Sequence, residues 1–173
     1  MIIILEGADL VGKSTLAENL SEKLGIPKTG IWIDLNHPKP AVISVSKTLN
    51  QVIQNLRPDI IFDRSFMSEW VYSKIKNRQD DYLNDLIDEW GKIDNLLLVI
   101  LYAEDDVLIK RFKIRGDQHF SITDILKAND LYQEFYNFVN KTIQCILIDV
   151  SYLTAQEMVK IIEDKVFKMI NIK

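Results

Sequence analysis

Short apolar runs alternate with amphipathic segments along the whole length of the chain. In the runs nearly every position is apolar, which is typical of strands buried on both faces of a sheet. The segments between them repeat apolar residues at helical spacing, which predicts helices with one buried face. The pattern predicts strands at residues 2–5, 31–33, 59–63, 96–101 and 145–150, and helices at residues 14–24, 42–56, 65–76, 80–93, 105–112, 121–139 and 154–170.

Strands that alternate with helices favour an α/β fold in which a parallel sheet is covered by helices on both faces. The length of 173 residues fits one domain, residues 1–173, and the prolines of residues 36–40 predict a loop inside it. Ligands of such sheets bind at the carboxyl ends of the strands. We therefore expect the functional residues to lie directly after strands.

The charge balance and the cysteine content narrow the classes of function. A net charge of -4 gives no general attraction to nucleic acid or to a membrane surface. The single cysteine, Cys145, excludes an intrachain disulfide and lies in an apolar run, which favours a buried core thiol over a nucleophile. No basic segment precedes the first apolar run, and no apolar stretch approaches the roughly 20 residues of a membrane span. We therefore predict a cytoplasmic protein with neither nucleic acid nor membrane as a partner.

Residues 7–14 have the form G-x-x-x-x-G-K-S and stand between the first predicted strand and the first predicted helix. This context favours a polyphosphate site over a purely structural glycine turn. Gly7 and Gly12 let the backbone turn its N–H groups toward the phosphates, and the helix start adds its positive dipole end. Lys13 supplies a charge for the β- and γ-phosphates, and Ser14 a hydroxyl for Mg²⁺. The predicted cofactors are ATP and Mg²⁺, and the predicted cofactor site is Gly7, Ala8, Asp9, Leu10, Val11, Gly12, Lys13, Ser14 and Thr15.

An acidic and a basic residue, Asp63 and Arg64, stand at the end of the predicted strand at residues 59–63. A carboxylate at this position can hold Mg²⁺ through water or accept a hydroxyl proton. The guanidinium group of Arg64 can form a bidentate pair of hydrogen bonds with a second phosphate. Ser68 and Tyr72 follow Arg64 at i+4 and i+8, so a helix places all three on one face. The alternatives are a surface ion pair at the strand end and core packing of Tyr72.

A basic cluster, Arg111, Lys113 and Arg115, contains two of only five arginines in the chain. A basic segment can close over phosphates, exclude water and neutralise charge in the transition state. We therefore predict a short lid at approximately residues 111–120, with a solvated helix end as the alternative. The predicted catalytic residues are Lys13, Asp63, Arg64, Arg111 and Arg115, and the predicted metal ligands are Ser14 and Asp63.

Carboxylates occur beside the predicted phosphate site, although a site that binds only phosphates has no use for a further negative charge. Glu6 and Asp9 flank Gly7, and Asp9 can hydrogen-bond a sugar hydroxyl. Glu69 follows Ser68 and can accept an N–H from a base. An ordinary solvated or capping carboxylate is the alternative for either acid.

These motifs together resemble those of thymidylate kinases. Residues 6–15, E-G-A-D-L-V-G-K-S-T, resemble that family's loop E-G-x-D-x-x-G-K-S-T. Residues 63–72, D-R-S-F-M-S-E-W-V-Y, resemble its D-R-Y-x-x-S-x-x-A-Y segment, with serine in place of the tyrosine and valine in place of the alanine. Residues 111–117 resemble the family's lid and residues 148–149 its last strand, so the resemblance spans the chain.

The resemblance implies a P-loop kinase fold with three layers, α/β/α, and a central parallel five-stranded sheet. It implies transfer of the γ-phosphate of Mg·ATP to a small-molecule partner, a deoxynucleoside monophosphate, and it leaves a homodimer open. By position, Asp9 would bind the deoxyribose 3′-hydroxyl, Arg64 the acceptor phosphate, and Tyr72 would disfavour a 2′-hydroxyl. Arg111 and Arg115 would act from the lid, because the loop itself carries no arginine.

The base of the acceptor is not identified by the resemblance. No residue between Ser14 and Asp63 matches the family's phenylalanine and arginine that hold thymine, so Trp32 is the candidate for base stacking. The predicted acceptor site is Asp9, Trp32, Arg64, Ser68, Glu69 and Tyr72.

Two other functions stay open. Residues 63–65, D-R-S, also resemble the acid-Arg-Ser segment of deoxynucleoside kinases, in which the acceptor would be a nucleoside and Asp34 would serve as the base. A non-catalytic nucleotide-dependent switch is less favoured, because such a protein needs a base-reading N-K-x-D. Residues 140–143 read N-K-T-I and lack the acid.

Overall fold

The computed structural model describes residues 1–30 and 38–171, and it contains strands and helices in alternation. The strands are β1 (Ile2–Gly7), β2 (Lys28–Gly30), β3 (Ile60–Asp63), β4 (Leu96–Tyr102) and β5 (Cys145–Asp149). The helices are α1 (Lys13–Leu24), α2 (Pro38–Leu56), α3 (Ser68–Ile75), α4 (Tyr82–Trp90), α5 (Asp105–Arg115), α6 (Ile122–Val139) and α7 (Ala155–Asn171).

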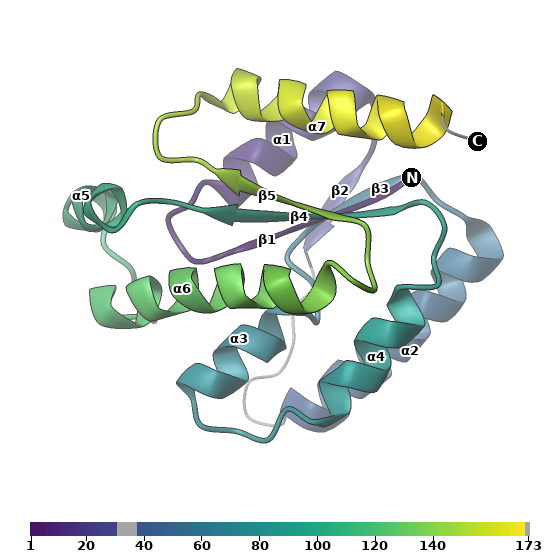
Figure 1. Ribbon diagram of the computed structural model, residues 1–173, viewed down its shortest axis with the longest axis horizontal. Helices are drawn as coiled ribbons and strands as arrows, with labels where there is room; N and C mark the ends of the chain where they lie inside the picture. Colours follow the sequence, from purple (N-terminus) through teal and green to yellow (C-terminus); the bar gives the residue numbers. More distant parts are fainter. Residues whose placement is uncertain (31–37, 172–173) are drawn as a thin grey trace.

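The five strands form one parallel sheet in the order β2-β3-β1-β4-β5. Figure 1 shows α1 and α7 on one face of this sheet and α2, α3, α4 and α6 on the other. Both faces are covered, which explains why the predicted strands read as continuous apolar runs. The predicted three-layer α/β/α fold is confirmed.

The position of β1 decides where a ligand can bind. The chain adds β2 and β3 on one side of β1 and then crosses to β4 and β5 on the other side. Leu5 pairs in register with Asp63, and Gly7 pairs with Leu101. The strand order therefore reverses at β1, and the loop after Gly7 opens at this switch point.

The second strand differs from its prediction. β2 comprises residues 28–30, all of which are exposed at the sheet edge, and the apolar pattern does not mark such a strand. The predicted strand at residues 31–33 lies outside the described residues. The predicted loop at 36–40 is wrong for residues 38–40, because α2 begins at Pro38. Proline fits the first turn of a helix, since the N–H that it lacks has no helical partner there.

Two element boundaries near the site also differ from the predictions, and the predicted helix at residues 80–93 is shorter, since α4 is Tyr82–Trp90. α3 begins at Ser68 rather than at residue 65, because the Ser65 hydroxyl accepts a hydrogen bond from the Met67 N–H at 3.1 Å and holds a turn before the helix. α5 continues past residue 112 to Arg115, where Gly116 with a φ of 67° ends it. The start of the predicted lid is therefore the last turn of a helix.

The remaining general predictions concern membranes and the cysteine. Within residues 1–30 and 38–171, no helix has the length and apolarity that crossing a membrane would require. Cys145 is half-buried in β5 rather than fully buried, and burial raises the pKa of its thiol to about 11. This thiol is a poor nucleophile near neutral pH, because little of it is ionised.

Candidate active site

Gly7 and Gly12 shape the loop between β1 and α1. Gly7 has a φ of 147°, and a Cβ atom there would stand 2.5 Å from the carbonyl oxygen of Leu101. Gly12 has a φ of 95° and directly precedes α1. Both positions therefore require glycine, the first for space and both for backbone conformation. The first backbone N–H groups of α1 have no helical partners, so they are available to an anion.

The other residues of the loop divide into supporting and exposed positions. Ala8 and Val11 are fully buried beneath the loop. Leu10 is half-buried and has a positive φ of 70°. Ser14 and Thr15 are exposed in the first turn of α1, where their hydroxyls can reach a bound nucleotide or its metal ion.

The Lys13 ammonium group is buried against the loop that it follows. Its Nζ donates a hydrogen bond to the carbonyl oxygen of Ala8 at 2.6 Å, and the residue is 6% exposed. Burial and the positive charge of Arg64 lower the pKa of Lys13 to about 7, although nearby carboxylates act in the opposite direction. Lys13 forms no direct ion pair with any described residue, so a bound phosphate would be a direct partner for its charge.

Three of the predicted acceptor residues meet at the rim of the loop. The Arg64 guanidinium donates to Asp9 Oδ1 at 2.5 Å and to the carbonyl oxygen of Gly7 at 3.2 Å. The Tyr72 hydroxyl donates to Asp9 Oδ2 at 3.1 Å. Burial raises the pKa of Asp9, but the charges of Arg64 and Lys13 outweigh it and hold the pKa below its usual value. Asp9 is therefore an ionised carboxylate that joins the loop to Arg64 and α3.

A fully buried carboxylate, Glu6, lies beneath this cluster. Glu6 Oε1 accepts hydrogen bonds from the backbone N–H and the hydroxyl of Ser65, both at 2.8 Å. Glu6 Oε2 accepts from the Ser68 hydroxyl at 2.7 Å and the Tyr132 hydroxyl at 3.0 Å. The Ser68 hydroxyl therefore uses its proton to bind Glu6, and the role of Ser68 toward an acceptor stays a prediction. Sequence reasoning missed Tyr132, because a tyrosine on an amphipathic helix looks like any core residue.

Asp63 and Ser14 lie on adjacent elements at the loop. Asp63 is the last residue of β3, is half-buried, and pairs in register with Leu5 and with Gly30. Its negative charge raises the pKa of Lys13, against the effects of burial and of Arg64. Within residues 1–30 and 38–171, no group of three or more His, Cys, Asp or Glu side chains could hold a metal ion.

The two arginines of the predicted lid differ in their surroundings. Arg111 donates to the carbonyl oxygens of Leu10 at 3.0 Å and Val150 at 3.2 Å, so it lies across the phosphate loop. Arg115 is exposed in the last turn of α5. At the other end of the lid, the Phe120 ring packs on Tyr72 with ring centroids 5.1 Å apart. The predicted lid, residues 111–120, therefore contacts the loop through Arg111 and the cluster of Asp9, Arg64 and Tyr72 through Phe120.

Glu69 is not part of the acceptor cluster. Both of its carboxylate oxygens accept hydrogen bonds from Arg78, at 2.7 to 3.0 Å, and the residue is buried. Burial raises the pKa of Glu69, and the bonds from Arg78 oppose that rise. The role of Glu69 as an acceptor for a base stays a prediction, and Trp32 and Asp34 lie outside the described residues.

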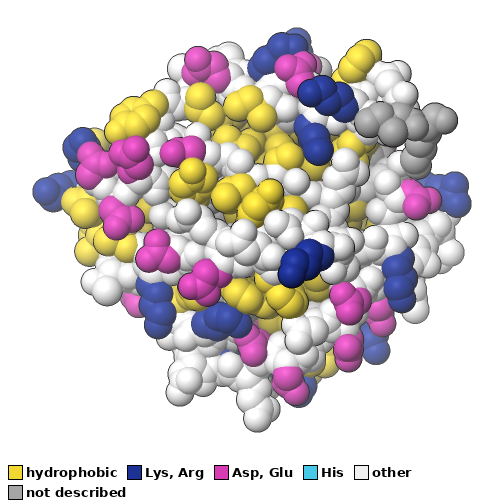
Figure 2. Space-filling model, viewed as in Figure 1, with side chains coloured by type: hydrophobic (Ala, Val, Ile, Leu, Met, Phe, Trp, Pro, Cys, Tyr) yellow, Lys and Arg dark blue, Asp and Glu magenta, His cyan; other side chains and the backbone are white. Residues whose placement is uncertain are grey.

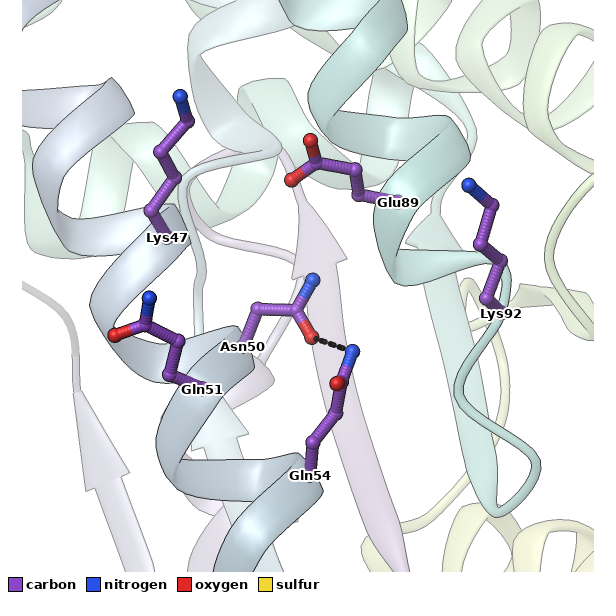
Figure 3. Close-up of a pocket in the computed structure, with 6 residues that line it drawn as sticks. All are labelled: Lys47, Asn50, Gln51, Gln54, Glu89 and Lys92. Atoms are coloured by element: carbon purple, nitrogen blue, oxygen red, sulfur yellow. Dashed lines mark hydrogen bonds between the residues drawn. The ribbon is translucent and has the colours of Figure 1, made fainter.

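A cavity of about 340 Å³ between α2 and α4 is remote from this site. Its lining residues, drawn in Figure 3, are Lys47, Asn50, Gln51, Gln54, Glu89 and Lys92. Four of them lie in α2, Glu89 lies in the last turn of α4, and Lys92 lies in the turn after it. Both helices lead to the amino ends of β3 and β4, at the edge opposite the phosphate loop. On the face drawn in Figure 2, basic and acidic side chains are interspersed and no continuous basic surface forms among the described residues.

The fold and the glycine loop define the class of the protein. Solved structures that resemble it include a nucleoside kinase, a nucleotide kinase and shikimate kinase. Deoxyadenosine kinase from M. mycoides matches with a TM-score of 0.68 and 23% identity over 97% of this chain and 100% of that chain. Thymidylate kinase from Candida albicans matches with a TM-score of 0.67 and 20% identity over 99% of this chain and 93% of that chain. This chain therefore has the P-loop kinase fold.

The family is that of YorR from Bacillus subtilis. The SPbeta prophage-derived uncharacterized protein YorR of strain 168 is 31% identical over 141 residues, which are 77% of this chain and 80% of YorR. The crystal structure of YorR in complex with phosphorylated GDP matches with a TM-score of 0.76 and 27% identity, over 96% of this chain and 95% of that chain. The chain belongs to the YorR family. No model of a known protein family matches it.

Proposed function

We propose that this protein is an ATP-dependent kinase that transfers the γ-phosphate to a deoxynucleoside monophosphate, as thymidylate kinases do. The observation that carries the proposal is the position of Arg64, which contacts both Gly7 of the phosphate loop and Asp9. A donor held by the loop and an acceptor phosphate held by Arg64 would share one edge of the sheet. Phosphoryl transfer depends mainly on such positioning and on neutralisation of charge.

The guanidinium group of Arg64 has N–H donors that could bind an acceptor phosphate. A guanidinium group has five N–H donors, and Arg64 makes three hydrogen bonds, to Gly7, Asp9 and Tyr132. Two N–H groups are left without an acceptor among the described residues, and a bidentate contact with phosphate uses two. A nucleoside has no phosphate to receive them, so the geometry favours a monophosphate acceptor.

Asp9 and Tyr72 are suited to the sugar of the acceptor. Each Asp9 oxygen accepts one hydrogen bond from Arg64 or Tyr72, and a carboxylate oxygen can accept a second. Asp9 can therefore accept a hydrogen bond from a 3′-hydroxyl without releasing Arg64. The Phe120 ring against Tyr72 adds an apolar wall, beside which a 2′-hydroxyl would have no partner.

Ser14 and Asp63 fit a magnesium ion that arrives with the nucleotide. Mg²⁺ is usually bound by one or two protein oxygens together with substrate phosphates and water. The exposed Ser14 hydroxyl and the Asp63 carboxylate would supply two such oxygens. The bound ion would neutralise charge on the β- and γ-phosphates.

Lys13 and Arg111 would stabilise the negative charge of the phosphoryl group in transfer. Lys13 lies inside the loop, and Arg111 lies across it through its bond to the Leu10 carbonyl. Both would exchange a backbone carbonyl for a phosphate oxygen, which is the stronger partner because it is charged. Arg115, exposed at the end of α5, would add its charge only when the lid closes.

The proposal is tested by ADP release from Mg·ATP with a panel of nucleosides and of deoxy- and ribonucleoside monophosphates. The panel includes guanine nucleotides, because the YorR crystal structure holds phosphorylated GDP. We expect turnover with at least one deoxynucleoside monophosphate, and a loss of about 100-fold in Arg64→Ala. Lys47→Ala, an exposed cation beside the remote cavity, should keep full activity.

Two outcomes would overturn the proposal. Turnover with nucleosides but not with monophosphates would make the protein a deoxynucleoside kinase, the class to which the M. mycoides structure belongs by name. Nucleotide binding without turnover on any acceptor would make it a non-catalytic nucleotide-binding protein.

A further inference from the structure

A hydrogen-bonded chain runs from Arg64 into the core beneath the proposed acceptor site. Its middle member is the hydroxyl of Tyr132 on α6, which accepts from Arg64 Nη1 at 3.3 Å and donates to Glu6 Oε2 at 3.0 Å. Tyr132 and Glu6 are both 0% exposed. Because neither residue reaches the surface, any effect that they have on a substrate must act through a side chain that they hold, either Arg64 or Ser68, whose hydroxyl lies 3.3 Å from that of Tyr132.

The chemistry of the chain suits a fixed link between two buried charges. A tyrosine hydroxyl has one proton and accepting lone pairs. With its proton toward the Glu6 carboxylate, the lone pairs of Tyr132 face the Arg64 guanidinium, so the hydroxyl dipole is aligned with both charges. Burial, and next the negative charge of Glu6, raise the pKa of Tyr132 well above its usual value, so the proton stays on the hydroxyl.

Both carboxylate oxygens of Glu6 accept hydrogen bonds from the surrounding residues. Its two oxygens accept four hydrogen bonds, from the backbone and hydroxyl of Ser65, from Ser68 and from Tyr132. The carboxylate therefore cannot turn, and it fixes the direction of the Tyr132 hydroxyl.

Arg64 needs such support because its backbone is strained. Its φ is 73°, which is uncommon for a residue other than glycine and persists only where the surroundings determine it. Its backbone N–H is bound to the Leu5 carbonyl at 3.0 Å, so the backbone is fixed by β1. The guanidinium is fixed separately, by Gly7, Asp9 and Tyr132.

We infer that Tyr132, with Glu6 behind it, is a positioning residue that fixes the guanidinium of Arg64 in the orientation that binds the acceptor phosphate. The inference rests on the proposed function and adds to it a residue from α6, the helix that follows the lid. A bidentate contact is sensitive to angle, so a less fixed Arg64 binds the acceptor more weakly. Binding of ATP in the glycine loop does not depend on this angle.

The test is the variant Tyr132→Phe, which removes the hydroxyl and keeps the ring. We expect the KM for the accepted monophosphate to rise about tenfold, which is the effect of weakening one charge-assisted hydrogen bond. The KM for ATP should stay within about twofold. Tyr136→Phe is the matched control, because Tyr136 lies one turn later on α6 and its hydroxyl has no hydrogen bond among the described residues. It should leave both constants unchanged.

A double variant separates positioning from a general structural role. Arg64→Lys keeps the charge but has no planar fork to orient. If Tyr132 acts through Arg64, Tyr132→Phe should change the KM for the monophosphate less than about twofold in the Arg64→Lys background. An unchanged KM in the single variant, an equal rise for both substrates, or the full rise in the Arg64→Lys background would each overturn the inference.

The remaining outcomes are also decisive. If Tyr132→Phe does not fold, Glu6→Gln takes its place, because it removes the charge that orients the hydroxyl and keeps the shape of the side chain. If the wild type is inactive on every acceptor, the proposed function fails but the inference is still testable. In that case hydrogen exchange of the Arg64 guanidinium, followed by NMR, should be faster in Tyr132→Phe than in the wild type, and equal rates would refute the positioning role.

Discussion

Lys13 should make the stability of the folded protein depend on pH. Its pKa is lowered from 10.5 to about 7 by burial and by Arg64, and the unfolded chain keeps the higher value. Between these pH values the unfolded chain binds more protons, so the free energy of unfolding rises with pH across that window. Below pH 7 both states are protonated and the full cost of the buried charge is present. The change in the free energy of unfolding from pH 7 to pH 10.5, at about 1.4 kcal/mol per pH unit, amounts to at most about 5 kcal/mol.

The perturbation is Lys13→Met, which removes the charge and keeps most of the length. At pH 6 we expect the variant to be more stable than the wild type by about 2–4 kcal/mol, after a loss of about 1 kcal/mol for the bond to Ala8. At pH 9 the free energy of unfolding of the wild type should be about 3 kcal/mol higher than at pH 6, so the difference between the variant and the wild type should nearly vanish. Urea unfolding at pH 6, 7, 8 and 9 measures the gap.

The control is Lys23→Met on the same helix, where the lysine side chain is 60% exposed. Its effect on the free energy of unfolding should be small and the same at every pH. A gap between wild type and Lys13→Met that stays constant from pH 6 to pH 9 would refute the reasoning, because it would show that Lys13 is charged throughout.

Three further variants test individual contacts. Tyr72→Phe removes the hydroxyl that donates to Asp9, and it should raise the KM for the monophosphate about fivefold while the KM for ATP stays the same. Steady-state kinetics with each substrate varied measure both constants. An equal rise in both, or no rise in either, would contradict the role of this contact. Glu69→Gln leaves the charge of Arg78 with a neutral partner, and urea unfolding should show a loss of about 1–3 kcal/mol. A change in base preference without loss of stability would instead assign Glu69 to the base. Arg111→Ala should lower the rate of phosphoryl transfer in single-turnover measurements at least about tenfold. An unchanged rate would show that Arg111 does not take part in the transfer step.

The phosphate loop could be predicted from the sequence because its information is local. The glycine spacing, the strand before it and the helix after it lie within one short stretch, and Gly7 and Gly12 have the backbone conformations that only glycine adopts readily. The meeting of Arg64 and Tyr72 was also predicted, but through a helix that does not include Arg64. The two side chains converge because both bind Asp9, not because they share a helical face.

The rest of the site depends on contacts between distant segments. Tyr132 stands 126 positions after the Glu6 that it binds, and nothing around it distinguishes it from a core aromatic residue. Glu69 was predicted to contact the acceptor because it follows Ser68, and nothing in the local sequence indicates that its carboxylate forms an ion pair with Arg78. The edge strand β2 carries no apolar pattern, since its residues are exposed.

The most direct test of the proposed activity identifies the product. Mg·ATP and the accepted deoxynucleoside monophosphate are incubated with the enzyme and followed by ³¹P NMR. We predict the signals of ADP and of the acceptor's diphosphate in equal amounts, and neither signal with Lys13→Ala. ADP with inorganic phosphate and an unchanged acceptor, or phosphate transferred to a nucleoside instead, would contradict the account.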